Sequence, residues 1–143
     1  MKKCARCGIE KSIDSFKDVR RKSGSKTKYS YCKSCEKQYA VDNAHRILNN
    51  AYREMDRKKG LEFNITDEFT KDMIFKPCVY CGGFSDSGYN GLDRVNNDIG
   101  HTVENCVTAC KECNNARNRY FSFEEMMVIG SAIASVRKSR EKQ

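Results

Sequence analysis

The sequence is poor in the apolar residues that build a large core: 38% of its 143 residues are hydrophobic and 32% are charged. A chain of this length suits one domain or two small ones. A chain this polar usually needs cross-links, such as disulfides or bound metal, to stay folded. No apolar run approaches the ~20 residues of a membrane span, so no membrane partner is expected. The opening residues, MKKCARCG, lack the apolar middle of a signal peptide. We therefore expect a soluble, intracellular (cytoplasmic) protein that is not secreted.

Nine cysteines could supply these cross-links. Eight of them form four Cys-x-x-Cys pairs, and Cys106 is unpaired in the sequence. The odd count and the spacing argue against a secreted disulfide framework. A redox Cys-x-x-Cys usually occurs once, within a βαβ pattern, and no such pattern is seen. Four thiolates presented as two short knuckles are typical of a tetrahedral structural zinc site. Two zinc ions per chain are therefore expected, the first held by Cys4, Cys7, Cys32 and Cys35 and the second by Cys78, Cys81, Cys110 and Cys113.

The charge is strongly positive, with 27 Lys and Arg against 19 Asp and Glu, a formal net charge of +8. Solubility alone would account for this excess, but the charge is clustered. Residues 17–28 hold six basic groups and one acid, and residues 137–142 hold four and one. Clusters of this kind indicate attraction to a polyanion, because neutralised phosphates release counterions and drive binding.

The pattern along the chain predicts a small α+β protein in four parts. Residues 1–37 are expected to form a zinc ribbon, two knuckles with a short hairpin between them. Residues 38–60 are expected to form a connecting helix, residues 61–121 a second zinc-stapled unit, and residues 122–143 a C-terminal helix with a basic tail. Thr66 is a plausible N-cap, and Ser122 with Glu125 forms a capping box. The apolar stripe of the connecting helix, which we place over residues 36–59, consists of Ala40, Ala44, Ile47, Leu48, Ala51, Tyr52 and Met55.

Between the last two knuckles the sequence predicts strand, turn, strand and helix over residues 91–118. This β-β-α order places Asp93 near the end of the first strand and Asn114 at the start of the helix. Their oxygens could point to one spot and hold a hard divalent ion such as Mg²⁺ or Mn²⁺. The alternative from spacing alone is that Asp93 caps a turn and Asn114 caps the helix. Cys106, beside the loop, is expected to be a small buried residue.

Residues 78–118 resemble an HNH, or ββα-metal, nuclease module in the zinc-knuckled form common in phage and bacterial proteins. The resemblance is carried by the two knuckles, by Leu92-Asp93, by Asn105 after Thr102-Val103-Glu104, and by Cys113-Asn114 followed by Arg117. The N-terminal ribbon also resembles one found before such modules. The resemblance implies that Asp93 and Asn114 hold the catalytic metal and that Asn105 fixes the loop through backbone hydrogen bonds.

The position directly after the aspartate is occupied by Arg94, where the family has a histidine that acts as general base. Arginine stays protonated and cannot take a proton from water. Two hypotheses remain open: His101 activates the water, or bulk water loses its proton with help from the metal alone. Arg94 would then be a phosphate clamp, a role suited to its planar donors. A slow or inactive nuclease is the third possibility.

The resemblance implies a metal-dependent DNA endonuclease that hydrolyses phosphodiester bonds and leaves a 5′-phosphate and a 3′-hydroxyl. The partner is expected to be duplex or branched DNA, with no small-molecule cofactor, and the sequence leaves the oligomeric state open. The alternative is a non-catalytic zinc-ribbon protein that binds nucleic acid and regulates transcription. Phosphate contacts, which position a protein without reading sequence, are predicted for Arg20, Arg21, Lys22, Lys26, Lys111, Arg117 and Arg119.

Overall fold

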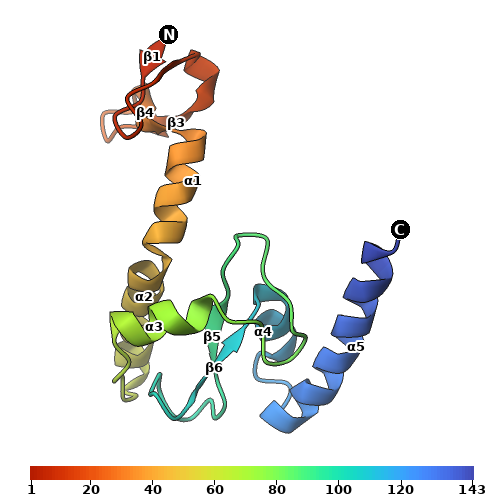
Figure 1. Cartoon of the computed structure of the whole chain (residues 1–143). Helices are drawn as coiled ribbons and strands as arrows, with labels where there is room; N and C mark the ends of the chain where they lie inside the picture. The colour runs from red at the N-terminus through yellow and green to blue at the C-terminus, as the bar shows by residue number, and fades with distance from the viewer. The chain divides into compact units, whose positions relative to one another are not determined.

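The computed structural model describes all 143 residues, which fall into two compact units, Met1–Asn43 and Ala44–Gln143. Five α-helices and three two-stranded antiparallel sheets make up the chain (Figure 1). The predicted small α+β class with two four-cysteine clusters is therefore confirmed. None of the helices combines the length and the apolar character that crossing a membrane requires.

The first unit is a knuckle, a hairpin and a helix built around the first four cysteines. Cys4, Phe16 and Cys32 form its small buried core, which leaves the thiolate cluster as the main organising feature of the unit. Cys32 and Cys35 lie at the start of a helix, with Cys32 as its N-cap. The predicted hairpin between the knuckles is present, and this helix follows it directly. The elements are β1 Lys2–Lys3, β2 Glu10–Lys11, the 3-10 turn η1 Ile13–Ser15, β3 Phe16–Arg20, β4 Lys26–Cys32 and α1 Lys33–Asp42.

The single helix predicted over residues 36–59 is two helices, α1 Lys33–Asp42 and α2 Ala44–Lys59, separated by Asn43. The Asn43 side chain donates to the carbonyl of Tyr39 at 2.9 Å, alongside the bond from its own backbone N–H. Asparagine competes in this way for backbone groups that would otherwise continue a helix. The division between the two units falls directly after this residue.

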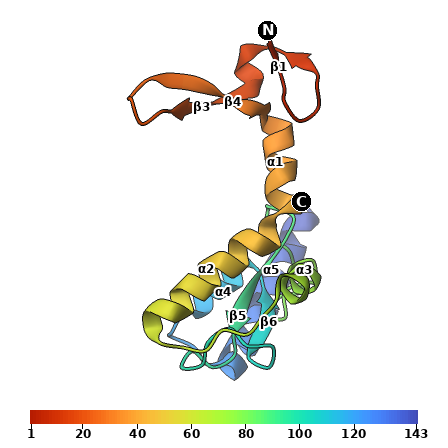
Figure 2. The ribbon, with the colours of Figure 1, turned by 90° about the vertical axis from the view of Figure 1, so that its left-hand side faces the viewer.

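The second unit is organised around the predicted β-β-α segment, which is confirmed. Strands β5 Gly91–Arg94 and β6 Cys106–Ala109 pair antiparallel, with Asp93 opposite Val107. Helix α4 Lys111–Arg117 follows β6. Helix α3 Asp67–Ile74 contacts both strands and helix α2, whereas α5 Phe123–Glu141 packs on α4 (Figure 2). The hairpin is thus held between two pairs of helices.

The buried face of α2 differs from the predicted apolar stripe. Ile47 and Met55 are exposed, and two polar residues of the helix, Asn49 and Asp56, are buried. Asn49 is satisfied by α3, since it accepts from the Thr70 hydroxyl and donates to an Asp67 oxygen. The buried face of α2 is therefore determined by hydrogen bonds to its neighbours as well as by apolar contact.

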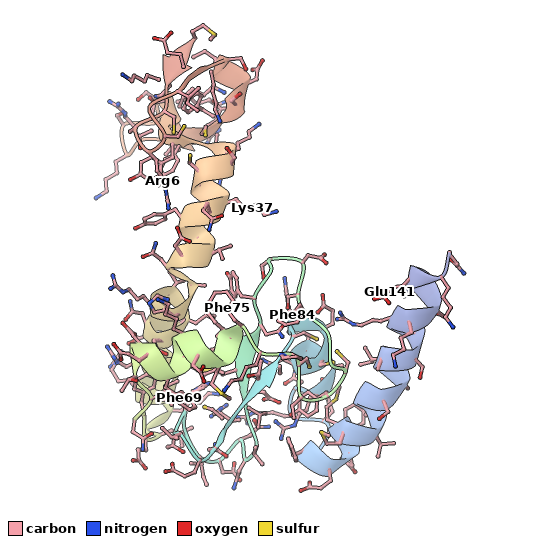
Figure 3. All side chains as sticks on the ribbon, viewed as in Figure 1. Arg6, Lys37, Phe69, Phe75, Phe84 and Glu141 are labelled. Atoms are coloured by element: carbon pink, nitrogen blue, oxygen red, sulfur yellow. The ribbon has the colours of Figure 1, made fainter.

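Two hydrophobic clusters support the hairpin from either side. One joins Tyr52, Ile65, Leu92 and Cys106 and is covered in part by Phe69 of α3, which is labelled in Figure 3. The other joins the second group of cysteines to Tyr80 of the knuckle, Ala109 of β6 and Met126 of α5. The buried position expected for Cys106 is confirmed, and burial raises the pKa of its thiol to about 12.

The predicted helix starts at Thr66 and Ser122 are confirmed. Thr66 accepts from the Phe69 backbone N–H at 3.1 Å, and Ser122 and Glu125 form both bonds of a capping box. Helix α5 then passes so close to the knuckle that a Cβ on Gly130 would collide with the backbone of Tyr80. A glycine is therefore required for this contact.

Candidate metal centres and active site

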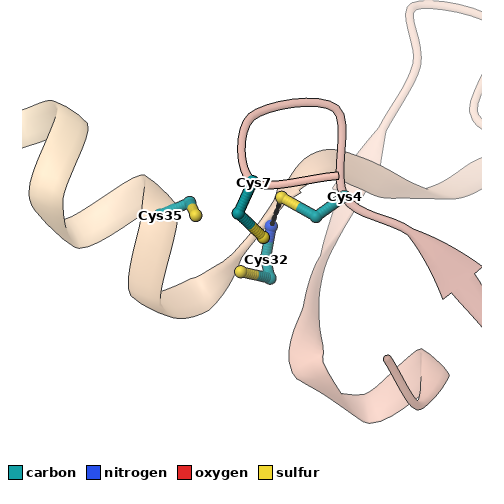
Figure 4. Close-up of side chains that lie close together, drawn as sticks. All are labelled: Cys4, Cys7, Cys32 and Cys35. Atoms are coloured by element: carbon teal, nitrogen blue, oxygen red, sulfur yellow. Dashed lines mark hydrogen bonds between the residues drawn. The ribbon is translucent and has the colours of Figure 1, made fainter. Parts of the chain in front are cut away.

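Each unit contains one cluster of four cysteines whose sulfur atoms all lie within 4.8 Å of one another. In the first unit, the knuckle residues Cys4 and Cys7 meet Cys32 and Cys35 at the start of α1 (Figure 4). The second cluster brings the knuckle at 78–81 to the start of α4. The four thiolate pairs predicted from spacing are thus combined as expected.

The two clusters share one local design. In each knuckle the glycine after the second cysteine, Gly8 or Gly82, has a positive φ of 72° or 71° and donates to the carbonyl of the first cysteine. In each helix start the first cysteine, Cys32 or Cys110, is an N-cap with nearly the same backbone angles, φ −69° and ψ 159° or φ −70° and ψ 159°. Local backbone geometry therefore points four sulfurs inward in both units.

The sulfur spacing fits one tetrahedral ion per cluster. Zinc–sulfur bonds of ~2.3 Å place tetrahedral sulfurs about 3.8 Å apart, and the Cys81 and Cys110 sulfurs lie 3.7 Å apart. A hydrogen bond from Cys113 lowers the pKa of Cys78 to about 4, and burial raises the pKa of Cys110 to about 12. Four crowded thiols therefore share protons unequally, and a divalent cation can replace those protons. A zinc ion bound in either cluster would be closed to substrate, because four thiolates leave it no open position.

In each cluster a basic side chain lies beside the sulfur of the N-cap cysteine. Lys11 Nζ lies 3.3 Å from Cys32 Sγ in the first unit, and Arg137 NH2 lies 3.4 Å from Cys110 Sγ in the second. Arg137 is fixed by further bonds to the carbonyl of Phe84 and to Glu112. One zinc with four thiolates carries two net negative charges, so each cation offsets part of that excess.

Replacing Arg137 by alanine is expected to weaken zinc binding at one of the two sites by about 10- to 100-fold, the usual effect of losing an outer-shell partner. Competition with a coloured chelator measures the zinc affinity of each site. Arg140→Ala, on the same exposed end of α5, is the matched control. Equal zinc affinity in the two variants would show that Arg137 has no role at the cluster.

The predicted metal ligand Asp93 lies on β5 and is largely buried. Its Oδ2 accepts from the Tyr80 hydroxyl at 2.6 Å and from Arg117 NH1 at 2.8 Å. Its Oδ1 makes no hydrogen bond and is not fully buried. A carboxylate held by one oxygen in this way presents the other to a ligand, as is usual for metal-binding carboxylates.

Asn114, the second predicted ligand, lies on α4 and borders the same cavity as Asp93, a space of about 190 Å³. Its backbone N–H donates to Cys110 O within the helix, and its side chain makes no hydrogen bond. A carboxylate and an amide oxygen at one small polar cavity fit a hard divalent cation. Asp93 and Asn114 thus border one cavity, and their convergence on a single ion stays a prediction.

His101 borders this cavity too, from the loop between the two strands. The residue is only 3% exposed, and burial lowers the pKa of its imidazole from the usual value against the raising effect of Asp56. Its ring stacks on Tyr52 with centroids 4.3 Å apart. Burial thus favours the neutral form of the imidazole, which lies at the cavity wall, and its role as general base stays a prediction.

Arg94, which follows Asp93, is mostly buried and borders the cavity. Its NH1 donates to the carbonyls of Asn97 and Ile99, both at 3.2 Å. Its other guanidinium nitrogens make no hydrogen bond within the protein and are not fully buried. One edge of Arg94 therefore holds the loop, while the rest can face an anion in the cavity.

Asn105 is bonded as the resemblance leads one to expect, and the loop that carries His101 depends on it. Its Oδ1 accepts from the Asn96 N–H at 2.9 Å, and its Nδ2 donates to the carbonyls of Asn96, Ile99 and Gly100. One buried amide therefore closes the loop over residues 96–100. Its role in any reaction stays a prediction.

The prediction that Arg117 contacts phosphate is wrong. Arg117 is 2% exposed, and its guanidinium donates to Asp93 and to the carbonyls of Arg94 and Val95. Because these donors are used inside the protein, Arg117 supports the metal ligand and cannot reach DNA. The other residues predicted to contact phosphate are exposed, namely Arg20, Arg21, Lys22, Lys26, Lys111 and Arg119.

Helix α2 supplies site residues that the sequence pattern did not reveal. Tyr52, Met55 and Lys59 border the cavity, and Asp56, fully buried, bonds His101. The apolar stripe predicts only packing for Tyr52 and Met55, and Asp56 carries no signal because a single aspartate on a charged helix usually faces solvent. Only the fold brings them to the β5–β6 hairpin.

Comparison with solved structures identifies the class of fold. The whole chain is similar to the rare-cutting HNH restriction endonuclease PacI, with a TM-score of 0.52 and 24% sequence identity over 99% of both chains. Together with the two four-cysteine clusters, this likeness gives the chain the fold of a zinc-containing HNH endonuclease.

Sequence comparison adds one relative. The chain is 37% identical over 84 residues to an uncharacterized protein of Acanthamoeba polyphaga mimivirus, a match that spans 59% of this chain and 16% of that protein. The matched region is therefore a small part of a much longer relative. No family model matches the chain.

Proposed function

We propose that this protein is a metal-dependent DNA endonuclease that hydrolyses phosphodiester bonds in the cavity beside β5. The observation that carries the proposal is the meeting of Asp93, Asn114 and His101 at one cavity of about 190 Å³. A metal-binding carboxylate, an amide and an imidazole together supply what metal-assisted hydrolysis needs.

DNA as the substrate is supported by two further observations. The solved structure with the same fold is described as a restriction endonuclease that perturbs DNA. The net charge of +8 favours a polyanion, because displaced counterions drive binding.

The proposed ligands of the catalytic ion, Mg²⁺ or Mn²⁺, are Asp93 and Asn114. When bound, the ion would neutralise the non-bridging oxygen and the departing 3′-oxygen of the phosphodiester. Arg117 and Tyr80 hold Oδ2 of Asp93, which leaves Oδ1 free to bind the ion. The free edge of Arg94 would bind the scissile phosphate.

His101 is the proposed general base. As a water oxygen bonds to phosphorus and the bond from phosphorus to the 3′-oxygen breaks, the water proton passes to the imidazole. The departing 3′-oxygen takes up a proton from solvent water and becomes the 3′-hydroxyl, and the imidazole later returns its own proton to solvent. The products are a 5′-phosphate and a 3′-hydroxyl.

The test is incubation of purified, zinc-loaded protein with supercoiled plasmid, with Mg²⁺, with Mn²⁺ and with neither. Nicked or linear plasmid that forms only with added metal is the expected result. Tight plasmid binding with no cleavage in either metal would overturn the proposal and favour the non-catalytic, regulatory reading.

The basic hairpin of the first unit is expected to bind the DNA backbone. Arg20 ends β3, and Arg21 begins the turn, where its N–H donates to Ser25 O. If both side chains contact phosphates, Arg20→Ala/Arg21→Ala will reduce the slope of log affinity against log salt by about 1.8, since each contact on duplex DNA contributes about 0.9. Fluorescence anisotropy with a labelled duplex measures the slope.

The matched control for the hairpin variant is Lys33→Ala/Lys37→Ala, which removes two exposed charges from α1 of the same unit. An equal change of slope in both double variants would show that the charge acts generally and that the hairpin makes no specific phosphate contacts.

A further inference from the structure

Helix α2 encloses the imidazole of His101 from two directions. Tyr52 and Asp56 are four residues apart and therefore share one face of the helix. The Tyr52 ring stacks on the imidazole at an interplanar angle of 17°, and its hydroxyl is fixed by the Leu92 N–H at 2.9 Å. Asp56 Oδ2 lies 2.8 Å from Nδ1 at the edge of the imidazole.

Asp56 is an unusual residue to find in this place. It is 0% exposed, and burial of a carboxylate is costly unless each oxygen is paired. Oδ2 accepts from the His101 backbone N–H at 2.7 Å as well as from the ring. Oδ1 is fully buried with no hydrogen bond, and its nearest charged neighbour is Arg94 NH1 at 3.9 Å.

The surrounding backbone accommodates this carboxylate. A Cβ on Gly100 would lie 3.0 Å from Asp56 Oδ2 and would collide with the backbone of Glu62. The loop can therefore reach Asp56 only with glycine at position 100. This close approach brings the backbone N–H and the ring Nδ1 of the next residue, His101, to one oxygen of Asp56.

We propose that Asp56 is a positioning residue that holds His101 in the tautomer with its proton on Nδ1 and its Nε2 free toward the cavity. The reaction in which this serves rests on the proposed function, but the tautomer itself does not. A carboxylate oxygen only accepts hydrogen bonds, so the ring nitrogen that faces it carries the proton. The other nitrogen, Nε2, makes no bond within the protein and is not fully buried, which leaves it able to accept a proton from water.

The same contact stabilises the charged product of proton transfer. When His101 takes up a proton, the nearby negative charge of Asp56 offsets the new positive charge, as the aspartate of a catalytic triad does. Arg94 lies on the other side of Asp56 and opposes this effect in part. Asp56 thus orients the imidazole and favours its protonated form, without contacting the substrate.

Nitrogen-15 NMR of the imidazole rings tests the tautomer without any need for activity. The chain has two histidines, so His45 serves as an internal comparison and the His101→Ala variant assigns the signals. The expected spectrum shows a protonated Nδ1 and an unprotonated Nε2 for His101. Protonation at Nε2 in the wild-type protein would overturn the proposal. Asp56→Ala is expected to lose the Nδ1 preference.

A double-mutant cycle tests whether Asp56 acts through His101. Asp56→Asn is expected to lower kcat for plasmid nicking by about 10- to 100-fold with KM nearly unchanged. Asp56→Asn/His101→Ala should be no slower than His101→Ala alone, because residues that act as a unit are not additive. Fully additive losses would overturn the proposal and show that Asp56 has a separate, structural effect.

Asp72→Asn is the matched control, since Asp72 lies on α3 and makes only an exposed pair with Lys76. A wild-type protein that cuts no DNA would refute the proposed function while the NMR result still decided the tautomer. The two failures are therefore distinguishable.

Discussion

Replacing Asp93 by asparagine is expected to reduce plasmid nicking by about 100- to 1,000-fold, the range lost when one preorganised electrostatic group is removed. In the wild type, Oδ2 accepts from Tyr80 and Arg117. The asparagine oxygen would keep these two donors, which turns the –NH2 group toward the cavity. An amide nitrogen cannot bind a metal cation, so the catalytic ion would lose its charged ligand. Initial nicking rates at saturating Mg²⁺ measure the effect.

Asp98→Asn is the matched control for this variant. Asp98 lies five residues further along, is exposed and does not border the cavity, so the same change of charge should leave the rate unaltered. Zinc content and the thermal transition check that Asp93→Asn stays folded, because its partner Arg117 is a buried cation. A folded Asp93→Asn protein that nicks at the wild-type rate would exclude Asp93 as a metal ligand.

Replacing Cys113 by serine is expected to halve the zinc content, from two ions per chain to one, and to unfold the second unit. Cys113 is fully buried in the cluster that joins the knuckle, β6 and α4. Structural zinc contributes ~10–16 kcal/mol of apparent binding free energy, as much as the whole stability of a typical domain, about 5–15 kcal/mol. Metal analysis and far-UV circular dichroism measure the two effects.

Two other cysteines provide controls for this result. Cys106→Ala removes a buried thiol that belongs to neither four-cysteine cluster, so both zinc ions and all nicking should remain. Cys7→Ser should also leave one zinc, while the second unit keeps its structure. Two zinc ions in Cys113→Ser, or none in the wild type, would contradict the assignment of the clusters.

The metal-binding framework was predictable from the sequence because it depends on short-range spacing. Two cysteines three positions apart, with a glycine after the knuckle, define a local backbone shape, and the same shape recurs at Gly8 and Gly82. The strand order and the position of Asp93 follow from the alternation in residues 91–95. These elements need few contacts from distant parts of the chain.

The residues that were misjudged depend on long-range packing. Arginine is the residue type expected to contact DNA phosphates, yet the fold places Arg117 against Asp93, 24 positions away. Asp56 resembles any acidic residue on an exposed helix, and it meets its partner His101 only across 45 positions. Polar residues buried by such contacts leave no periodic signal, so a pattern of apolar positions cannot detect them.

The break at Asn43 is a third case. The apolar residues before and after it share one helical period, which favours a continuous helix over residues 36–59. A single side chain that bonds the carbonyl of Tyr39 is enough to end α1 there. Local competition of this kind is stronger than a weak periodicity, and it places the boundary between the two units at this residue.

The most direct test of the account is the position of a bound Mn²⁺ ion. Crystals of the zinc-loaded protein, soaked in Mn²⁺ and measured at wavelengths that separate the two metals by anomalous scattering, locate each ion independently of activity. The account predicts two zinc ions in the cysteine clusters and one manganese ion bonded to both Asp93 and Asn114. Manganese bound only to other surface carboxylates, with none between these two side chains, would contradict it.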